Sequence, residues 1–106
     1  MTQKQTHLEA AKEVLAIEQA SLGYIADNLD VAFTGAVDAV LSSTGRLVVC
    51  GMGKSGLIGK KIAATLASTG TPSFSMHPGE AYHGDLGMVH PDDVFLAISN
   101  SGETEE

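Results

Sequence analysis

A lysine and a serine lie inside a glycine-rich turn near the middle of this 106-residue chain. The turn reads GMGKSG over residues 51–56, includes Lys54 and Ser55, and follows the apolar run at residues 47–50. Glycines let the backbone turn tightly and approach a ligand, and a helix that begins here directs its unpaired N–H groups at the same spot. This pattern predicts an anion site.

Hydroxyl side chains gather in a second turn, which follows the apolar run at residues 94–98. Ser99, Ser101 and Thr104 surround Gly102, and a helix would open after them. Serine and threonine are also common helix caps, so a purely structural role exists for them. We favour phosphate binding, because a strand followed by a glycine turn with hydroxyl groups occurs twice.

A third group of polar side chains lies in the connection HPGEAYHGDLG at residues 77–87. His77 and His83, with Glu80 and Asp85 nearby, have the chemistry to bind a divalent metal or the hydroxyls of a sugar. Two ordinary hydrogen-bonded histidines would explain the spacing equally well. The connection leaves the carboxyl end of a strand beside the first glycine turn, where open α/β sheets bind ligands.

Apolar periodicity and capping residues predict the elements that position these groups. Thr6 and Glu9 fit the capping box of an amphipathic helix, and Asp30 is expected to cap a second helix that ends near residue 42. Strand, helix and strand in succession form a βαβ unit, which predicts an α/β fold with a parallel sheet. The expected strands are residues 47–50, 73–76 and 94–98, and the expected helix between the first two is residues 55–68.

Composition limits the possible partners. The net charge of −7 argues against binding to nucleic acid and to anionic membrane surfaces, whereas a local nest of N–H groups can still hold a small phosphorylated ligand. The single cysteine, Cys50, excludes a disulfide framework and is expected to be a packed core thiol. The N-terminus lacks an apolar leader and no run is long enough to span a bilayer, so we expect a cytoplasmic location.

Two nucleotide-binding motifs do not fit the sequence around the first glycine turn. Residues 51–56 match the dinucleotide pattern G-x-G-x-x-G, but that fold needs an acidic residue at the end of the second strand, where the chain has Met76-His77. A nucleotide P-loop would need a glycine five positions before Gly53, and Val48 stands there. The anion site is therefore expected to bind something other than a nucleotide.

Three motifs resemble those of the sugar isomerase (SIS) domain, and within it the D-arabinose 5-phosphate isomerases. They are GMGKSGLIGKKIAATLASTGTPSF, HPGEAYHGDLGMV and ISNSGETEE. The resemblance implies a three-layer α-β-α fold with a parallel sheet, flavodoxin-like or Rossmann-like and incomplete here. It implies an N-terminal helical segment at residues 1–45 and the first half of a SIS domain at residues 46–106. Typical members continue into paired CBS modules, so we expect a fragment that is inactive alone.

This family interconverts D-arabinose 5-phosphate and D-ribulose 5-phosphate for the Kdo of lipopolysaccharide, or for capsule, and its typical members are homotetramers. The resemblance implies that Lys54 and Glu106 are catalytic. It also implies that His77 can hold an inhibitory zinc, although the reaction requires no cofactor. The residues that it places against the sugar phosphate are Ser55, Gly70, Thr71, His77, His83, Ser99, Ser101 and Thr104.

The residue types suit the movement of a carbonyl between C1 and C2. This reaction needs a base, a group that stabilises the enediolate oxygen, and an acid that returns the proton. Glu106 is the expected base, and Lys54 is expected to stabilise negative charge or to hold the phosphate. The resemblance also implies another catalytic glutamate and a histidine further downstream. The alternative is a non-catalytic SIS module that binds a sugar phosphate and regulates transcription or another enzyme, since the phosphate loops are in this chain and those two groups are not.

Overall fold

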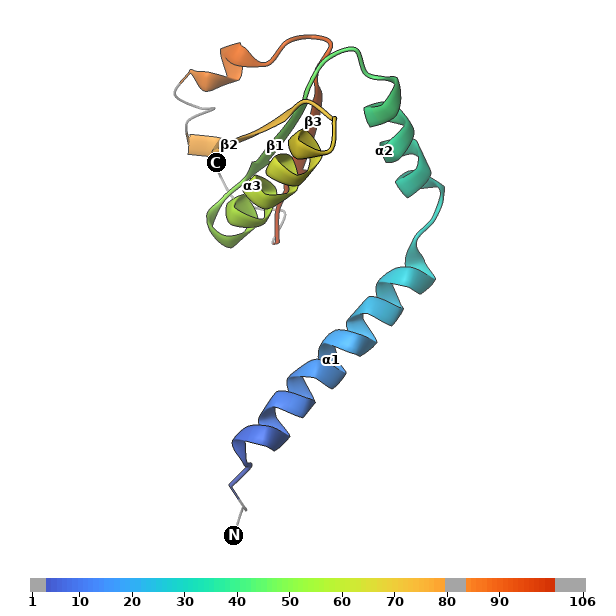
Figure 1. Cartoon of the computed structure of the whole chain (residues 1–106), viewed down its shortest axis with the longest axis vertical. Coiled ribbons are helices and arrows are strands. Elements are labelled where there is room, and N and C mark those ends of the chain that lie inside the picture. Colours follow the sequence, from blue (N-terminus) through green and yellow to red (C-terminus); the bar gives the residue numbers. More distant parts are fainter. Residues whose placement is uncertain (1–3, 80–83, 101–106) are drawn as a thin grey trace. The chain divides into compact units, whose positions relative to one another are not determined.

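A computed structural model of the chain describes residues 4–79 and 84–100 (Figure 1). The chain divides into two compact units, residues 1–36 and 37–106, and each is taken by itself below. The elements in chain order are helix α1 (His7–Asn28), helix α2 (Val31–Ser42), strand β1 (Leu47–Gly51), helix α3 (Gly53–Ser68), strand β2 (Ser73–Met76), the 3-10 helix η1 (Asp85–Met88) and strand β3 (Val94–Ile98).

Capping residues define the helices of the N-terminal segment. The Thr6 hydroxyl accepts a hydrogen bond from the Glu9 N–H at 3.1 Å, and the Glu9 carboxylate accepts one from the Thr6 N–H at 3.4 Å, which confirms the predicted capping box. At the start of α2, the Asp30 carboxylate accepts a hydrogen bond from the Ala32 N–H at 2.9 Å, as predicted. Neither helix buries a residue among those that the structure describes.

The three strands form one parallel sheet in the order β2-β1-β3. Helix α3 connects β1 to β2 and lies against all three strands (Figure 1), so the predicted βαβ unit and the α/β fold with a parallel sheet are confirmed. In the centre of the sheet, Cys50 is paired with Met76 on one side and with Ala97 on the other. All three carboxyl ends therefore lie at one edge, which we call the carboxyl edge.

The core forms around β1, whose five residues are all buried because the strand has a neighbour on both sides. Leu47 and Val49 pack with Ala63 of α3, and Gly59 of the same helix is buried as well. A Cβ on Gly59 would lie only 3.0 Å from Cγ1 of Val49, so the helix approaches the sheet closely there. Cys50 is a buried free thiol, as predicted, and burial raises its pKa.

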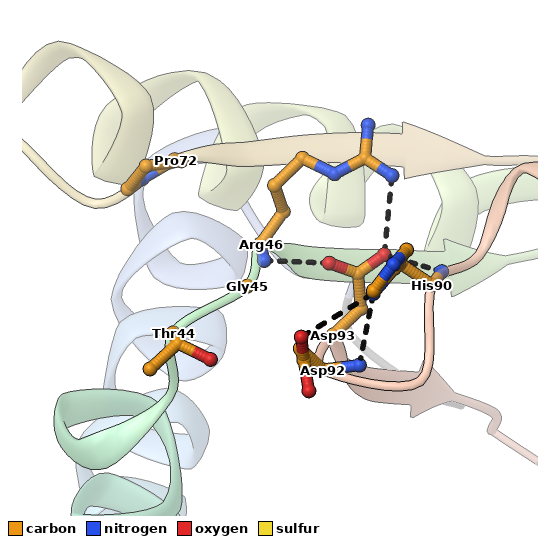
Figure 2. A pocket seen from close by; sticks show the side chains of 7 residues that line it. All are labelled: Thr44, Gly45, Arg46, Pro72, His90, Asp92 and Asp93. Carbon is orange, nitrogen blue, oxygen red and sulfur yellow. Dashed lines mark hydrogen bonds and ion pairs between the residues drawn. The ribbon is translucent and has the colours of Figure 1, made fainter.

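An ion pair joins the amino ends of β1 and β3 (Figure 2). The Asp93 carboxylate, 1% exposed, accepts hydrogen bonds from the Arg46 N–H at 2.6 Å, from the His90 N–H at 2.8 Å and from Arg46 Nη2 at 3.1 Å. These bonds lower the pKa of Asp93 to about 2. The guanidinium of Arg46 also donates to the Met88 carbonyl at 2.9 Å and lies 4.7 Å from the ring centre of Phe74. Arg46 thus ties β1, β2 and the segment before β3 together.

Within residues 4–79 and 84–100, none of the helices combines the length and the apolar character that crossing a bilayer would need.

Candidate functional site

Four of the predicted site residues meet at the carboxyl edge. Lys54 and Ser55 lie in the first turn of α3 directly after β1, His77 follows β2, and Ser99 follows β3. Because the strands are parallel and in register, the segments that leave them start side by side. The structure therefore places the starts of three connections, which are far apart in the sequence, at the same edge of the sheet.

Backbone contact between β1 and α3 explains two glycines of the first turn. A Cβ on Gly51 would lie 2.9 Å from the carbonyl carbon of Ser55, and a Cβ on Gly56 would lie 2.5 Å from the carbonyl oxygen of Gly51. Both positions are too tight for a side chain, because the last residue of the strand touches the first turn of the helix. Gly53, between them, has a φ of +56°, which glycine adopts without strain.

This turn leaves the start of α3 suited to an anion. The N-cap residue is Met52, whose side chain makes no capping hydrogen bond within the described part of the chain. The first N–H groups of a helix have no intrahelical partner and carry part of the positive end of the helix dipole. Lys54 adds a cationic side chain, and Ser55 adds a hydroxyl in the same turn. A phosphate or an enediolate is the kind of group that these donors would bind.

Gly70 and Thr71, in contrast, lie at the opposite edge of the sheet. Helix α3 runs from Gly53 to Ser68 and rises about 1.5 Å per residue, so about 20 Å of helix lies between Lys54 and these residues. Gly70 has a φ of +104° and ends the helix, and Thr71 leads into β2. The structure does not bring these two residues together with Lys54 within one copy of the chain, and their role in binding stays a prediction.

Four predicted site residues lie outside the described residues: His83, Ser101, Thr104 and Glu106. The roles assigned to them stay predictions. Among the described residues, no group of three or more His, Cys, Asp or Glu side chains is placed to hold a metal ion. The zinc expected at His77 therefore stays a prediction too.

The Arg46–Asp93 ion pair is a feature that the sequence analysis missed. Both residues line a cavity of about 410 Å³ at the amino edge (Figure 2). The residues that line it are Thr44, Gly45, Arg46, Pro72, His90, Asp92 and Asp93. The pair follows from the register of β1 and β3, which the structure supplies. Leu47 is paired with Val94, so the residues just before them, of opposite charge, are neighbours.

The parallel sheet, with a glycine turn and a cationic helix start at its carboxyl edge, is an open α/β arrangement of the kind that binds ligands at the carboxyl ends of its strands. The family model of the SIS domain matches residues 40–106, and the chain belongs to the SIS domain family.

The relatives of this chain include sugar-phosphate isomerases. It is 59% identical over 98 residues to arabinose 5-phosphate isomerase KdsD of Escherichia coli K12, an alignment that covers 92% of this chain and 30% of that enzyme. Among solved structures, it resembles an E. coli CFT073 protein in complex with arabinose 5-phosphate, with a TM-score of 0.83, 43% identity and coverage of 94% of this chain and 55% of the other. It also resembles a Bacteroides fragilis protein assigned as a phosphosugar isomerase involved in capsule formation, with a TM-score of 0.85 and 40% identity. That match covers 94% of this chain and 53% of the other.

The chain thus spans about a third of the length of the curated E. coli enzyme and about half of each of these solved chains.

Proposed function

We propose that the protein to which this chain belongs is an aldose–ketose isomerase that interconverts D-arabinose 5-phosphate and D-ribulose 5-phosphate. The observation that carries this proposal is the 59% identity to an arabinose 5-phosphate isomerase over 92% of the chain. The geometry agrees with it, because Lys54, Ser55 and His77 lie at the edge where a parallel sheet binds its ligand.

The reaction requires one proton to move between two neighbouring carbons. A base removes the proton from C2 of the aldose, the electron pair forms the enediolate across C1 and C2, and a proton returns to C1 while the O2 proton is transferred to O1. Glu106 is the proposed base. The Lys54 ammonium and the first N–H groups of α3 supply positive charge for the enediolate or the phosphate.

C2 is oxidised and C1 is reduced within the same molecule, so the reaction needs no external oxidant or reductant, and we propose that the enzyme works without a cofactor. We also place it in the cytoplasm as a homotetramer that binds neither nucleic acid nor membrane. The net charge of −7 supports the last point, because a phosphate-rich surface would be repelled. The assembly is measured by light scattering on the full-length protein, where a monomer would contradict it.

The role of Lys54 is tested by Lys54→Ala in the full-length protein, with turnover of arabinose 5-phosphate as the readout. Removal of one preorganised electrostatic group costs about 10²- to 10³-fold in kcat. Lys61→Ala is the matched control, because Lys61 lies two turns further along the same helix, about 10 Å away, and is exposed. Turnover that is equal in both variants would contradict the role of Lys54. Binding of the sugar phosphate without turnover in the wild type would favour the regulatory module.

A further inference from the structure

Two turns with the sequence His-Pro-X make the same hydrogen bond. Nδ1 of His77 accepts from the Gly79 N–H at 2.9 Å, and Nδ1 of His90 accepts from the Asp92 N–H at 3.3 Å. Proline between the two partners has no N–H and a fixed φ, so the N–H of the third residue is the one that turns back to the ring. The local sequence therefore dictates this bond.

The bond decides where the proton of the neutral ring resides. A neutral imidazole has one N–H donor and one nitrogen with a lone pair. Because a backbone N–H can only donate, Nδ1 of His77 must supply the lone pair, and the ring proton is on Nε2. Gly79 thus fixes the tautomer of His77 through its backbone, without any side chain.

His77 lies at the carboxyl edge of the sheet, where an Nε2–H could donate to a bound ligand. Cys50 is paired with Met76, so His77 stands level with Gly51, where the glycine turn begins. The His77 side chain is exposed at this edge, close to the start of α3. Its Nε2–H is a donor, and the hydroxyl, carbonyl and phosphate oxygens of a sugar phosphate are acceptors.

We propose that His77 donates a hydrogen bond from Nε2 to an oxygen of the bound sugar phosphate, and that the Gly79 N–H is the positioning group that keeps the proton on Nε2. This inference rests on the proposed function. It assigns His77 as a donor that orients the ligand, and Gly79 as the residue that acts through it.

The same bond has a consequence for metal binding. A Zn²⁺ ion needs a nitrogen lone pair. It can bind Nε2 only if the proton moves to Nδ1 and the Gly79 hydrogen bond breaks, and it can bind Nδ1 only by displacing the Gly79 N–H. Zinc on Nε2 and the sugar phosphate would therefore require different forms of the His77 ring, whereas zinc on Nδ1 would compete with the Gly79 N–H and leave the Nε2 proton in place.

The tautomer is tested by NMR on the full-length protein labelled with ¹⁵N-histidine, at a pH where the ring is neutral. The expected spectrum shows His77 protonated on Nε2, with its signals assigned by their loss in His77→Gln. Arabinose 5-phosphate is expected to shift the signals of His77 and to leave those of His90, which has the same turn at the other edge. A ring protonated on Nδ1, or His77 signals that do not respond at a saturating concentration, would overturn the proposal.

Two substitutions test the donor by turnover. His77→Gln keeps an N–H donor at a similar reach, whereas His77→Leu keeps none. Loss of one hydrogen bond is expected to lower kcat/KM about 10-fold in His77→Leu, and His77→Gln is expected to lose less than His77→Leu because it keeps a donor. Equal losses in both would overturn the donor role. If the wild type shows no turnover, the proposed function fails, while the NMR experiment still reports the tautomer and ligand binding.

Discussion

The contact between Gly56 and Gly51 offers a sharp test of how the fold positions the site. In Gly56→Ala the new Cβ would lie 2.5 Å from the Gly51 carbonyl oxygen, whereas ordinary contact begins at 3.4 Å. The obstacle is backbone of the central strand, which cannot rotate away as a side chain does. We therefore expect the start of α3, with Lys54 and Ser55, to move by about 0.9 Å.

The expected magnitudes predict a larger effect on turnover than on the free energy of unfolding. Overpacking of this kind costs about 1–3 kcal/mol. Alanine is a better helix former than glycine by about 1 kcal/mol, which offsets part of that cost. A net destabilisation of about 0–2 kcal/mol follows. A displacement near 1 Å at a catalytic group, however, can lower turnover about 10²-fold.

The assay compares Gly56→Ala with Gly35→Ala in the full-length protein. Gly35 lies inside α2, and a Cβ there would meet nothing within 4 Å. We expect this control to keep full kcat/KM and to unfold at the wild-type temperature or slightly above it. Circular dichroism and thermal melts show whether Gly56→Ala is folded. A folded Gly56→Ala with wild-type kcat/KM would refute the argument that strand-to-helix contact positions Lys54.

Three further predictions concern stability. Asp93→Asn should lower the Tm because the ion pair with Arg46 is lost, whereas Asp92→Asn, at a carboxylate 61% exposed, should change it little. The folded pKa of Asp93 is lowered to about 2 from 3.8, so its stabilisation is present above pH 4 and is lost as the pH falls towards 2. The free energies of unfolding of the wild type and of Asp93→Asn should therefore converge near pH 2. Curves that stay parallel down to that pH would contradict this prediction. Val49→Ala, at a side chain 1% exposed, should cost about 2–3 kcal/mol in denaturant unfolding, and Val31→Ala, 85% exposed, less than about 0.5 kcal/mol.

Local chemistry made much of this fold predictable. The strands at residues 73–76 and 94–98 have the predicted bounds, because each is a short apolar run between turn residues. Helix α3 begins at Gly53, two residues before its predicted start, since the glycine turn is already part of the helix. The predicted cap at Thr6 is present because a capping box depends on residues only three positions apart.

Longer-range features could not be predicted in the same way. The sheet order β2-β1-β3 places β3 beside β1, and the local sequence does not specify which neighbour a strand takes. The Arg46–Asp93 pair depends on that order and on the register, so it became visible only in the structure. The placement of Gly70 away from Lys54 likewise follows from the direction of α3, which motif matching does not consider.

The central claim is that this chain is part of an enzyme that isomerises a pentose 5-phosphate by proton transfer. The most direct measurement is ¹H NMR of arabinose 5-phosphate in D₂O with the full-length protein. The account predicts that ribulose 5-phosphate signals grow and that solvent deuterium enters at C1, because the proton passes through a base. Arabinose 5-phosphate that stays unchanged in the presence of the natively folded protein would contradict it.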